Sequence, residues 1–270
     1  MANPKVCLLT IDPQVDFCEG GALPVTGATK DMERLASMVD KHGNDIDSIQ
    51  ITMDSHYHVH IAHACFWQDS KGNHPPHISK GVTVIDENAI TSGQWRPTNP
   101  ALKDWALHYV KQLAANKRYA LVIWPDHCII GSKGHMIHPL FFDAVNRWET
   151  RYTTIAPRTT KGSNFKTEHY SAVKADVPDP EDEGTRLNGR LVSTLKRYDI
   201  ILISGEALSQ CVANTIRDTA DTFSPEQVKK FVLLEDASSN VPGFEKLGQD
   251  FVSEKMAKGM QISRTDTFFK

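Results

Sequence analysis

Cys211 is the residue best placed to act as a nucleophile. It follows an apolar run from Ile200 that predicts a buried strand ending at Gly205. A helix is predicted from Val212 toward Thr222, and the dipole at a helix N-terminus favours a thiolate. Free cysteines are also often small buried hydrophobic residues. Cys211 therefore needs partners elsewhere in the chain before a catalytic role follows.

Carboxylates and a histidine follow two other apolar runs. The run 6–11 ends at Asp12, and the run 47–53 ends at Asp54-Ser-His56. Ligands bind at the carboxyl ends of parallel strands, although Asp also caps helices and forms turns. Asp54 and His56 can point the same way on extended chain, and their donor atoms suit zinc, iron or manganese. A polar surface loop is the alternative interpretation of this segment.

His127 could complete a metal site from a distant part of the chain. It follows the apolar run 119–124, which we interpret as another buried parallel strand. Because parallel strands end at one edge of a sheet, His127 would meet Asp54 and His56 there. Three histidines lie closer to His56 in the sequence and could equally be metal ligands or belong to a surface loop: His58, His60 and His63.

The composition is that of an ordinary globular protein. The 270-residue chain is 40% hydrophobic and 23% charged, with a formal net charge of −3, which predicts one large α/β domain. It offers no broad basic field for nucleic acid, no apolar run of membrane-spanning length and no signal peptide. Five widely spaced cysteines without a CxxC pair argue against disulfides. We expect a cytoplasmic protein with no nucleic-acid or membrane partner.

Periodicity predicts the elements that must position these residues. Further strands are expected at 82–85, 153–156, 231–234 and 260–263, and helices at 29–42, 100–115, 139–148, 187–198 and 243–258. Strands that alternate with helices predict a parallel sheet. The mixed pattern from residue 64 to about 117 indicates an insertion, of the kind that often forms a lid or binding element.

In combination, the motifs resemble the nicotinamidase branch of the isochorismatase-like cysteine hydrolases. The matches run in family order: Ile11-Asp-Pro-Gln-Val-Asp-Phe17, Asp54-Ser-His56, Trp124-Pro-Asp-His127, Lys161-Gly-Ser-Asn and Gly205-Glu-Ala-Leu-Ser-Gln-Cys211. The resemblance implies a single isochorismatase-like domain over 1–270, with the insertion at about 64–117. It also implies a three-layer α/β sandwich of Rossmann-like topology, with a mostly parallel six-stranded sheet between helices.

The resemblance implies a catalytic trio of Asp12, Lys161 and Cys211. Asp12 would take the thiol proton, and Lys161 would favour the thiolate and hold the carboxylate. The oxyanion hole would be formed by the backbone N–H groups of Ala207 and Cys211, with a cis peptide bond between Glu206 and Ala207. By residue type alone, Lys161 would be interpreted as an exposed, solvated cation.

The resemblance further implies one divalent metal ion held by Asp54, His56 and His127. Zinc is expected first, with iron or manganese as alternatives. By spacing, His60 is the candidate fourth ligand and His63 the second choice. The ion would anchor the ring nitrogen of a substrate rather than generate hydroxide.

The implied activity is hydrolysis of nicotinamide or a similar small heteroaromatic amide, through a cysteine thioester, to the carboxylic acid and ammonia. Phe17 and Trp124 fall where family members stack on an aromatic substrate, although core packing is an equal alternative. A hydrolase of another small amide or carbamoyl compound stays open, as does a non-catalytic ligand-binding homologue. We expect a small-molecule amide as the partner, and a homo-oligomer.

Overall fold

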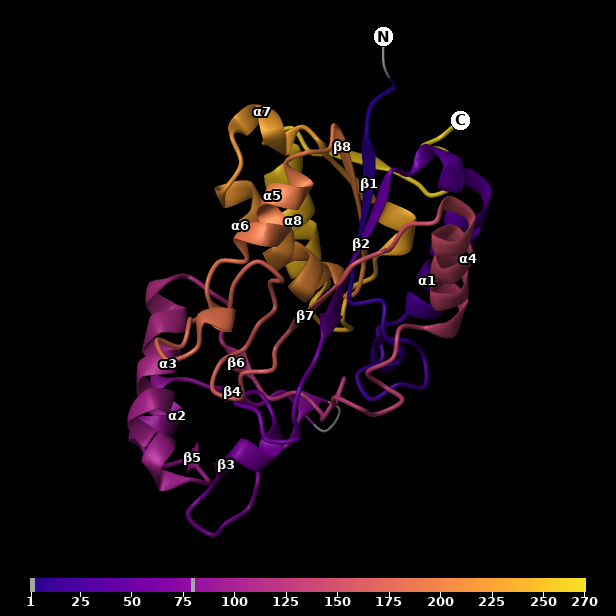
Figure 1. Cartoon of the computed structure of the whole chain (residues 1–270). Coiled ribbons are helices and arrows are strands. Elements are labelled where there is room, and N and C mark those ends of the chain that lie inside the picture. Colours follow the sequence, from indigo (N-terminus) through magenta and orange to yellow (C-terminus); the bar gives the residue numbers. More distant parts are fainter. Residues whose placement is uncertain (1–2, 79–80) are drawn as a thin grey trace.

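The central sheet consists of six parallel strands. A computed structural model describes residues 3–78 and 81–270 (Figure 1). The strands are β1 (Val6–Ile11), β2 (Ser48–Asp54), β7 (Arg158–Lys161), β8 (Ile200–Gly205), β9 (Phe231–Leu234) and β10 (Gln261–Ser263). Their order is β10-β9-β8-β1-β2-β7, and every pairing is parallel. The inner strands β1 and β9 are buried along their whole length, as continuous apolar runs in a covered parallel sheet must be.

Helices cover both faces of this sheet and give three layers (Figure 1). On one face, α1 (Ala28–His42) packs against α4 (Pro139–Tyr152). The other face carries α5 (Gly189–Leu195), α6 (Ala213–Asp221), the short α7 (Pro225–Val228) and α8 (Glu245–Met256). The predicted α/β class with a six-stranded parallel sheet is confirmed. Within the described ranges, no helix has both the length and the hydropathy to cross a membrane.

The segment between β2 and α4 forms a group of small elements beyond the carboxyl end of β2 (Figure 1). Its two small sheets pair β3 (Trp67–Gln68) with β5 (Arg96–Pro97) and β4 (Val84–Ile85) with β6 (Leu121–Val122). Its helices are α2 (Glu87–Thr91) and α3 (Lys103–Ala115), whose Tyr109 and Leu113 are buried. The group lies where the sequence predicts an insertion at 64–117. The division of the chain into a domain and an insertion stays a prediction.

Two predicted strands differ from the structure. The run 119–124 is expected in the central sheet, but β6 pairs antiparallel with β4 in a sheet of two strands. An apolar run reports burial and not the sheet to which a strand belongs, so this prediction was wrong. Residues 153–156 form no strand, since β7 begins at Arg158. As an edge strand with polar side chains, β7 lacks the apolar signature that reveals the inner strands.

Candidate active site

The carboxyl ends of four neighbouring strands bring the predicted catalytic residues together. β1 lies between β8 and β2, and β7 follows β2 at the edge of the sheet. The parallel register places Lys161, the last residue of β7, opposite Asp54, the last residue of β2. Asp12 directly follows β1, and Cys211 comes shortly after β8. Side chains from distant parts of the chain therefore share one edge of the sheet.

Lys161 lies at the centre of this group. Its Nζ is 2.8 Å from Asp12 Oδ2, 3.5 Å from Cys211 Sγ and 3.0 Å from Asp54 Oδ1. All four side chains are buried. The interpretation of Lys161 as an exposed cation is wrong. Its ammonium group joins a carboxylate, a thiol and a second carboxylate away from bulk water.

Burial controls the protonation of this group. Burial raises the pKa of the Cys211 thiol well above its usual range; Lys161 lowers it, and the two carboxylates raise it again. The expectation of an acidic thiol is therefore wrong for the free site. Burial also raises the pKa of Asp12, against the lowering effect of Lys161. The site therefore favours a thiol that keeps its proton and a more basic carboxylate, and both groups contact the same Lys161 ammonium.

Cys211 lies in a π-helical turn, Leu208–Val212, and not in the first turn of α6. π-Helical turns occur frequently at functional sites. The N–H groups of Gln210 and Val212 both donate to the Ala207 carbonyl. The peptide bond between Glu206 and Ala207 is cis, as the resemblance implies. The turn thus presents the Cys211 thiol to Lys161 Nζ.

Asp54, His56 and His127 form a buried group that can hold a metal ion. Their donor atoms lie within 4.8 Å of one another. Asp54 Oδ2 is 3.0 Å from His56 Nε2 and 3.4 Å from His127 Nε2. We assign Nδ1–H to both rings, because each Nδ1 faces a backbone carbonyl, that of Gly162 at 3.0 Å and that of Pro125 at 2.8 Å. This tautomer directs the Nε2 lone pairs toward the carboxylate, as in metal-binding histidines.

His127 reaches this group by a route that the sequence did not indicate. The His56 N–H donates to the Cys128 carbonyl, and the Ile130 N–H donates to the His56 carbonyl. The loop after β6 is therefore fastened to the segment after β2, although β6 lies outside the central sheet. The predicted meeting of the three ligands occurs, but backbone hydrogen bonds between loops produce it.

Comparison of the sequence with known proteins identifies a relative that is a nicotinamidase. No protein-family model matches the chain. The nicotinamidase of Escherichia coli strain K12 is 26% identical over 219 residues, which cover 80% of this chain and 76% of that protein. The chain is similar in sequence to a nicotinamidase. The resemblance predicted from the motifs is confirmed.

Solved structures show the same nicotinamidase fold over almost the whole chain. A nicotinamidase/pyrazinamidase of Acinetobacter baumannii matches with a TM-score of 0.62 and 20% identity, covering 98% of this chain and 99% of that one. The yeast nicotinamidase bound to the inhibitor nicotinaldehyde matches with a TM-score of 0.63 and 18% identity, and the match covers 96% of this chain and 99% of that one. The pyrazinamidase of Pyrococcus horikoshii in complex with zinc matches with a TM-score of 0.55 and 18% identity, and the match covers 97% of this chain and 99% of that one.

Two residues that support the candidate site escaped the sequence analysis. Thr52 Oγ1 donates to Asp12 Oδ1 at 2.6 Å. The Gln14 side chain holds the Asp54 backbone, donating to its carbonyl at 2.8 Å and accepting from its N–H at 2.7 Å. Alternation along β2 places Thr52 on the same side as Asp54, which is the signal that could have identified it. No comparable signal exists for Gln14, because its role depends on how two strand ends meet.

The two candidates for a fourth metal ligand differ in their free lone pairs. His60 is satisfied at both ring nitrogens, since Nδ1 accepts from the Ala62 N–H and Nε2 donates to the Thr167 carbonyl, each at 3.2 Å. His63 Nδ1 lies 3.0 Å from the His58 carbonyl, and its buried Nε2 has no hydrogen-bond partner in the described ranges. The free Nε2 lone pair therefore makes His63, the second choice by spacing, the better candidate, although His63 is outside the group of donor atoms that lie within 4.8 Å of one another.

The two aromatic residues expected at the substrate are buried beside the site. The Phe17 ring meets the His127 ring edge-on, with centroids 5.6 Å apart. The Trp124 ring lies 5.7 Å from that of Phe244, and its Nε1 donates to the Tyr170 hydroxyl at 2.9 Å. Both rings already have packing partners in the nicotinamidase-like fold. A role in substrate binding stays a prediction.

Proposed function

We propose that the chain hydrolyses nicotinamide or a similar small heteroaromatic amide to the carboxylic acid and ammonia. The contacts of Lys161 carry this proposal, because one buried ammonium touches the proposed base, the proposed nucleophile and a metal-site carboxylate. The nicotinamidase of E. coli and the structure of a yeast nicotinamidase bound to nicotinaldehyde support this choice of substrate class.

Cys211 is the proposed nucleophile and Asp12 its base. As the sulfur attacks the amide carbonyl, Asp12 takes the thiol proton and Lys161 balances the charge. The N–H groups of Ala207 and Cys211 stabilise the oxyanion. The C–N bond then breaks, and Asp12 returns its proton to the departing ammonia. As a carboxylate again, Asp12 takes a proton from the water that hydrolyses the thioester.

Asp54, His56 and His127 would hold one divalent ion, with His63 as the proposed fourth protein ligand. Zinc is the first choice for two or three imidazoles and a carboxylate, with iron or manganese as alternatives. A bound ion supplies an electrophilic anchor for the ring nitrogen of the substrate. Asp54 links the two halves of the site, because Oδ1 contacts Lys161 and Oδ2 faces the imidazoles. The chain thereby fixes the substrate ring relative to the attacking sulfur.

Ammonia release from nicotinamide tests the proposed function. We expect activity in the wild type, a loss on the order of 10³-fold or more in Cys211→Ala, and near wild-type activity in Cys65→Ala. Cys65 is the matched control, since its thiol is partly exposed and donates to the His58 carbonyl rather than contacting Lys161. Undiminished activity in Cys211→Ala would contradict the thioester route.

A second candidate keeps the reaction and changes the substrate. Ammonia release from another small amide or a carbamoyl compound, with none from nicotinamide, would favour it over the first. Inactivity toward all such compounds, with an unreactive Cys211, would indicate a non-catalytic ligand-binding homologue. The homo-oligomer and the cytoplasmic location stay predictions.

A further inference from the structure

Two buried carboxyl groups face each other behind the turn that carries Ala207. Glu206 directly precedes Ala207, and Asp31 lies on α1; both side chains are buried. The Asp31 carboxyl group is close enough to Glu206 to raise the pKa of the Glu206 side chain. Ser239 connects them as well, since its N–H lies 3.3 Å from Glu206 Oε2 and its Oγ lies 2.5 Å from Asp31 Oδ2.

The available hydrogen-bond donors leave one of the four carboxyl oxygens of the pair without a partner. Arg34 donates to Asp31 Oδ1 at 3.0 Å, and Ser239 donates once to each group. Glu206 Oε1 is buried and has no donor in the described part of the chain. A buried carboxylate oxygen without a donor is costly, whereas a protonated Oε1 is itself a donor to Asp31. One shared proton leaves the pair with a single negative charge beside Arg34.

The surroundings of the pair favour this protonated state. Burial and the neighbouring Asp31 carboxylate raise the pKa of Glu206 well above its usual range. Burial likewise raises the pKa of Asp31, against the lowering effect of Ser239 and Arg34. The charged and titratable groups that face the pair are Arg34 on α1, Cys18 and Glu19 on the loop after β1, and Asp236 in the turn Glu235–Ala237. Three of these four groups are acids or a thiol, so a second negative charge on the pair is disfavoured.

The same residues fasten the turn to two other parts of the site. The Glu206 N–H donates to the Ile11 carbonyl at 2.8 Å, next to Asp12. The Leu208 N–H donates to the Ser239 carbonyl, also at 2.8 Å. Ser239 is therefore held by the pair through its N–H and hydroxyl, and it holds the turn through its carbonyl. A change in the pair reaches the turn through one residue.

We propose that Asp31 and Glu206 share one proton and act as a positioning pair that holds the turn bearing Ala207 and Cys211. Its effect on turnover rests on the proposed function. Neither carboxyl group is placed to touch substrate. When the shared proton is lost at high pH, two like charges face each other in a buried site, and the turn is displaced. Because the pKa of Glu206 is raised in the fold, this contribution to stability is present at low pH and is lost as the pH rises through the folded-state pKa.

Glu206→Gln tests the pair, because its amide donates to Asp31 without a titratable proton. We expect kcat near the wild-type value at neutral pH and an alkaline limb that extends to higher pH than in the wild type. Asp31→Asn, which replaces the other carboxyl group of the pair by an amide, should likewise extend the alkaline limb to higher pH. Glu206→Leu leaves Asp31 without this donor and should lower kcat by roughly 10- to 100-fold, with KM little changed. Glu33→Gln, on the exposed side of α1, is the matched control.

Two readouts need no substrate and separate this inference from the proposed function. One is the rate at which iodoacetamide alkylates Cys211, followed by peptide mass; the other is the free energy of unfolding in urea. Both should depend on pH in the wild type and in Glu33→Gln, and this dependence should weaken in Glu206→Gln. If nicotinamide is not hydrolysed, the alkylation rate and the free energy of unfolding still show whether Asp31 and Glu206 share a proton. The same pH dependence in wild type and Glu206→Gln would overturn the inference, whether or not Glu206→Leu folds.

Discussion

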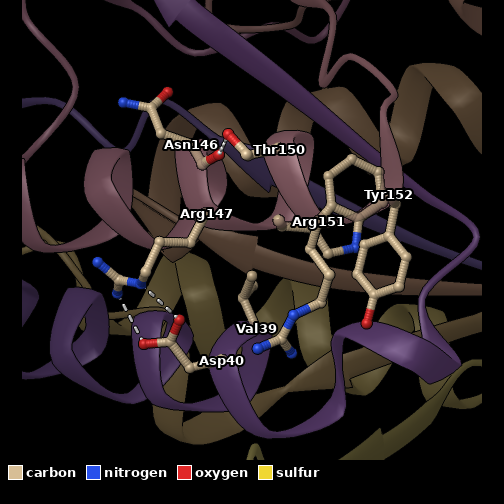
Figure 2. Close-up of a pocket in the computed structure, with 8 residues that line it drawn as sticks. Val39, Asp40, Asn146, Arg147, Thr150, Arg151 and Tyr152 are labelled. Atoms are coloured by element: carbon tan, nitrogen blue, oxygen red, sulfur yellow. Dashed lines mark hydrogen bonds and ion pairs between the residues drawn. The ribbon is translucent and has the colours of Figure 1, made fainter.

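Two ion pairs of almost equal length lie in opposite environments. Lys161 Nζ is 2.8 Å from Asp12 Oδ2, and these side chains are 1% and 0% exposed. Arg147 Nη2 is 2.7 Å from Asp40 Oδ2, and these side chains are 58% and 42% exposed. The second pair lies at a hollow of about 540 Å³ between α1 and α4, which Tyr152 also lines (Figure 2). Only the first pair has a nucleophile and a metal-ligand group beside it.

The difference shows that the open hollow does not mark the site. None of the eight residues that line it is a cysteine or a histidine, so the hollow contains no nucleophilic thiol and no imidazole ligand. Water and salt screen its ion pair, so the pair contributes little to stability. Breaking a buried pair costs about 3–5 kcal/mol, because one charge is left without compensation. Buried charges that converge from several strand ends are therefore the stronger indication of function.

The largest effect is expected from Lys161→Met, which removes the buried cation at similar volume. The carboxylates of Asp12 and Asp54 would then repel each other without compensation. The free energy of unfolding should fall by about 3–5 kcal/mol. Amide hydrolysis should fall by on the order of 10²- to 10³-fold, because a preorganised charge is lost. Urea unfolding and ammonia release measure the two effects, and an unfolding free energy like that of the wild type would contradict the comparison.

The next largest effect is expected on the pH dependence of stability, from Asp176, a buried carboxyl group of which only one oxygen lies near a cation. Asp176 Oδ1 is 3.5 Å from Arg118 Nε, and Asp176 Oδ2 has no hydrogen-bond partner in the described residues. Arg118 Nη2 instead donates to both carboxylate oxygens of Asp218, at 2.8 and 2.9 Å. Burial raises the pKa of Asp176 to about 7 although Arg118 lowers it. This group therefore favours the protonated state in the fold.

The sign of the pH effect follows from that raised pKa. The contribution of Asp176 to stability is present below about pH 4 and is lost as the pH rises through the folded-state pKa near 7. The wild type should lose at most roughly 4 kcal/mol over this range from this group alone. Asp176→Asn should lack this part of the pH dependence. Urea unfolding from pH 4 to 8 measures it, and parallel curves for the two proteins would rule it out.

The sequence predicted the site residues best where an apolar run is a strand buried within the central sheet. β1 and β8 are apolar because the sheet buries both faces, so Asp12 and the turn before Cys211 could be placed at strand ends. The apolar run that leads to His127 is buried by small elements outside the sheet, which a one-dimensional pattern cannot show. Its loop reaches the metal site only through hydrogen bonds that involve His56 and Cys128.

Electrostatic predictions failed where three-dimensional burial decides the result. Residue type suggests that Lys161 is exposed, and only its register beside Asp54 shows why it is buried. A helix N-terminus suggests an acidic Cys211, but burial raises the pKa of this thiol, and the carboxylates of Asp12 and Asp54 add to the effect. Neither the depth of a side chain nor the sum of charges around it can be read from local sequence.

A smaller effect is expected at the metal site, where His60 and His63 provide a matched pair of buried histidines. His63→Ala removes a ring nitrogen with a free lone pair and should weaken zinc binding by roughly 10- to 100-fold or more. His60→Ala should weaken it less, because both ring nitrogens of His60 are already engaged by the backbone. Calorimetric titration with zinc after chelator treatment measures both. A greater loss in His60→Ala would reverse the assignment.

The smallest effect is expected at the exposed pair in the hollow of Figure 2. Asp40→Asn should leave the free energy of unfolding close to the wild-type value, and any difference should shrink further in 1 M salt because the charges are screened. Ammonia release should be unchanged, since α1 and α4 carry this pair on the outside of the molecule. A double-mutant cycle with Arg147→Gln isolates the coupling between the two side chains. A coupling of several kcal/mol would show that burial is not what separates the two pairs.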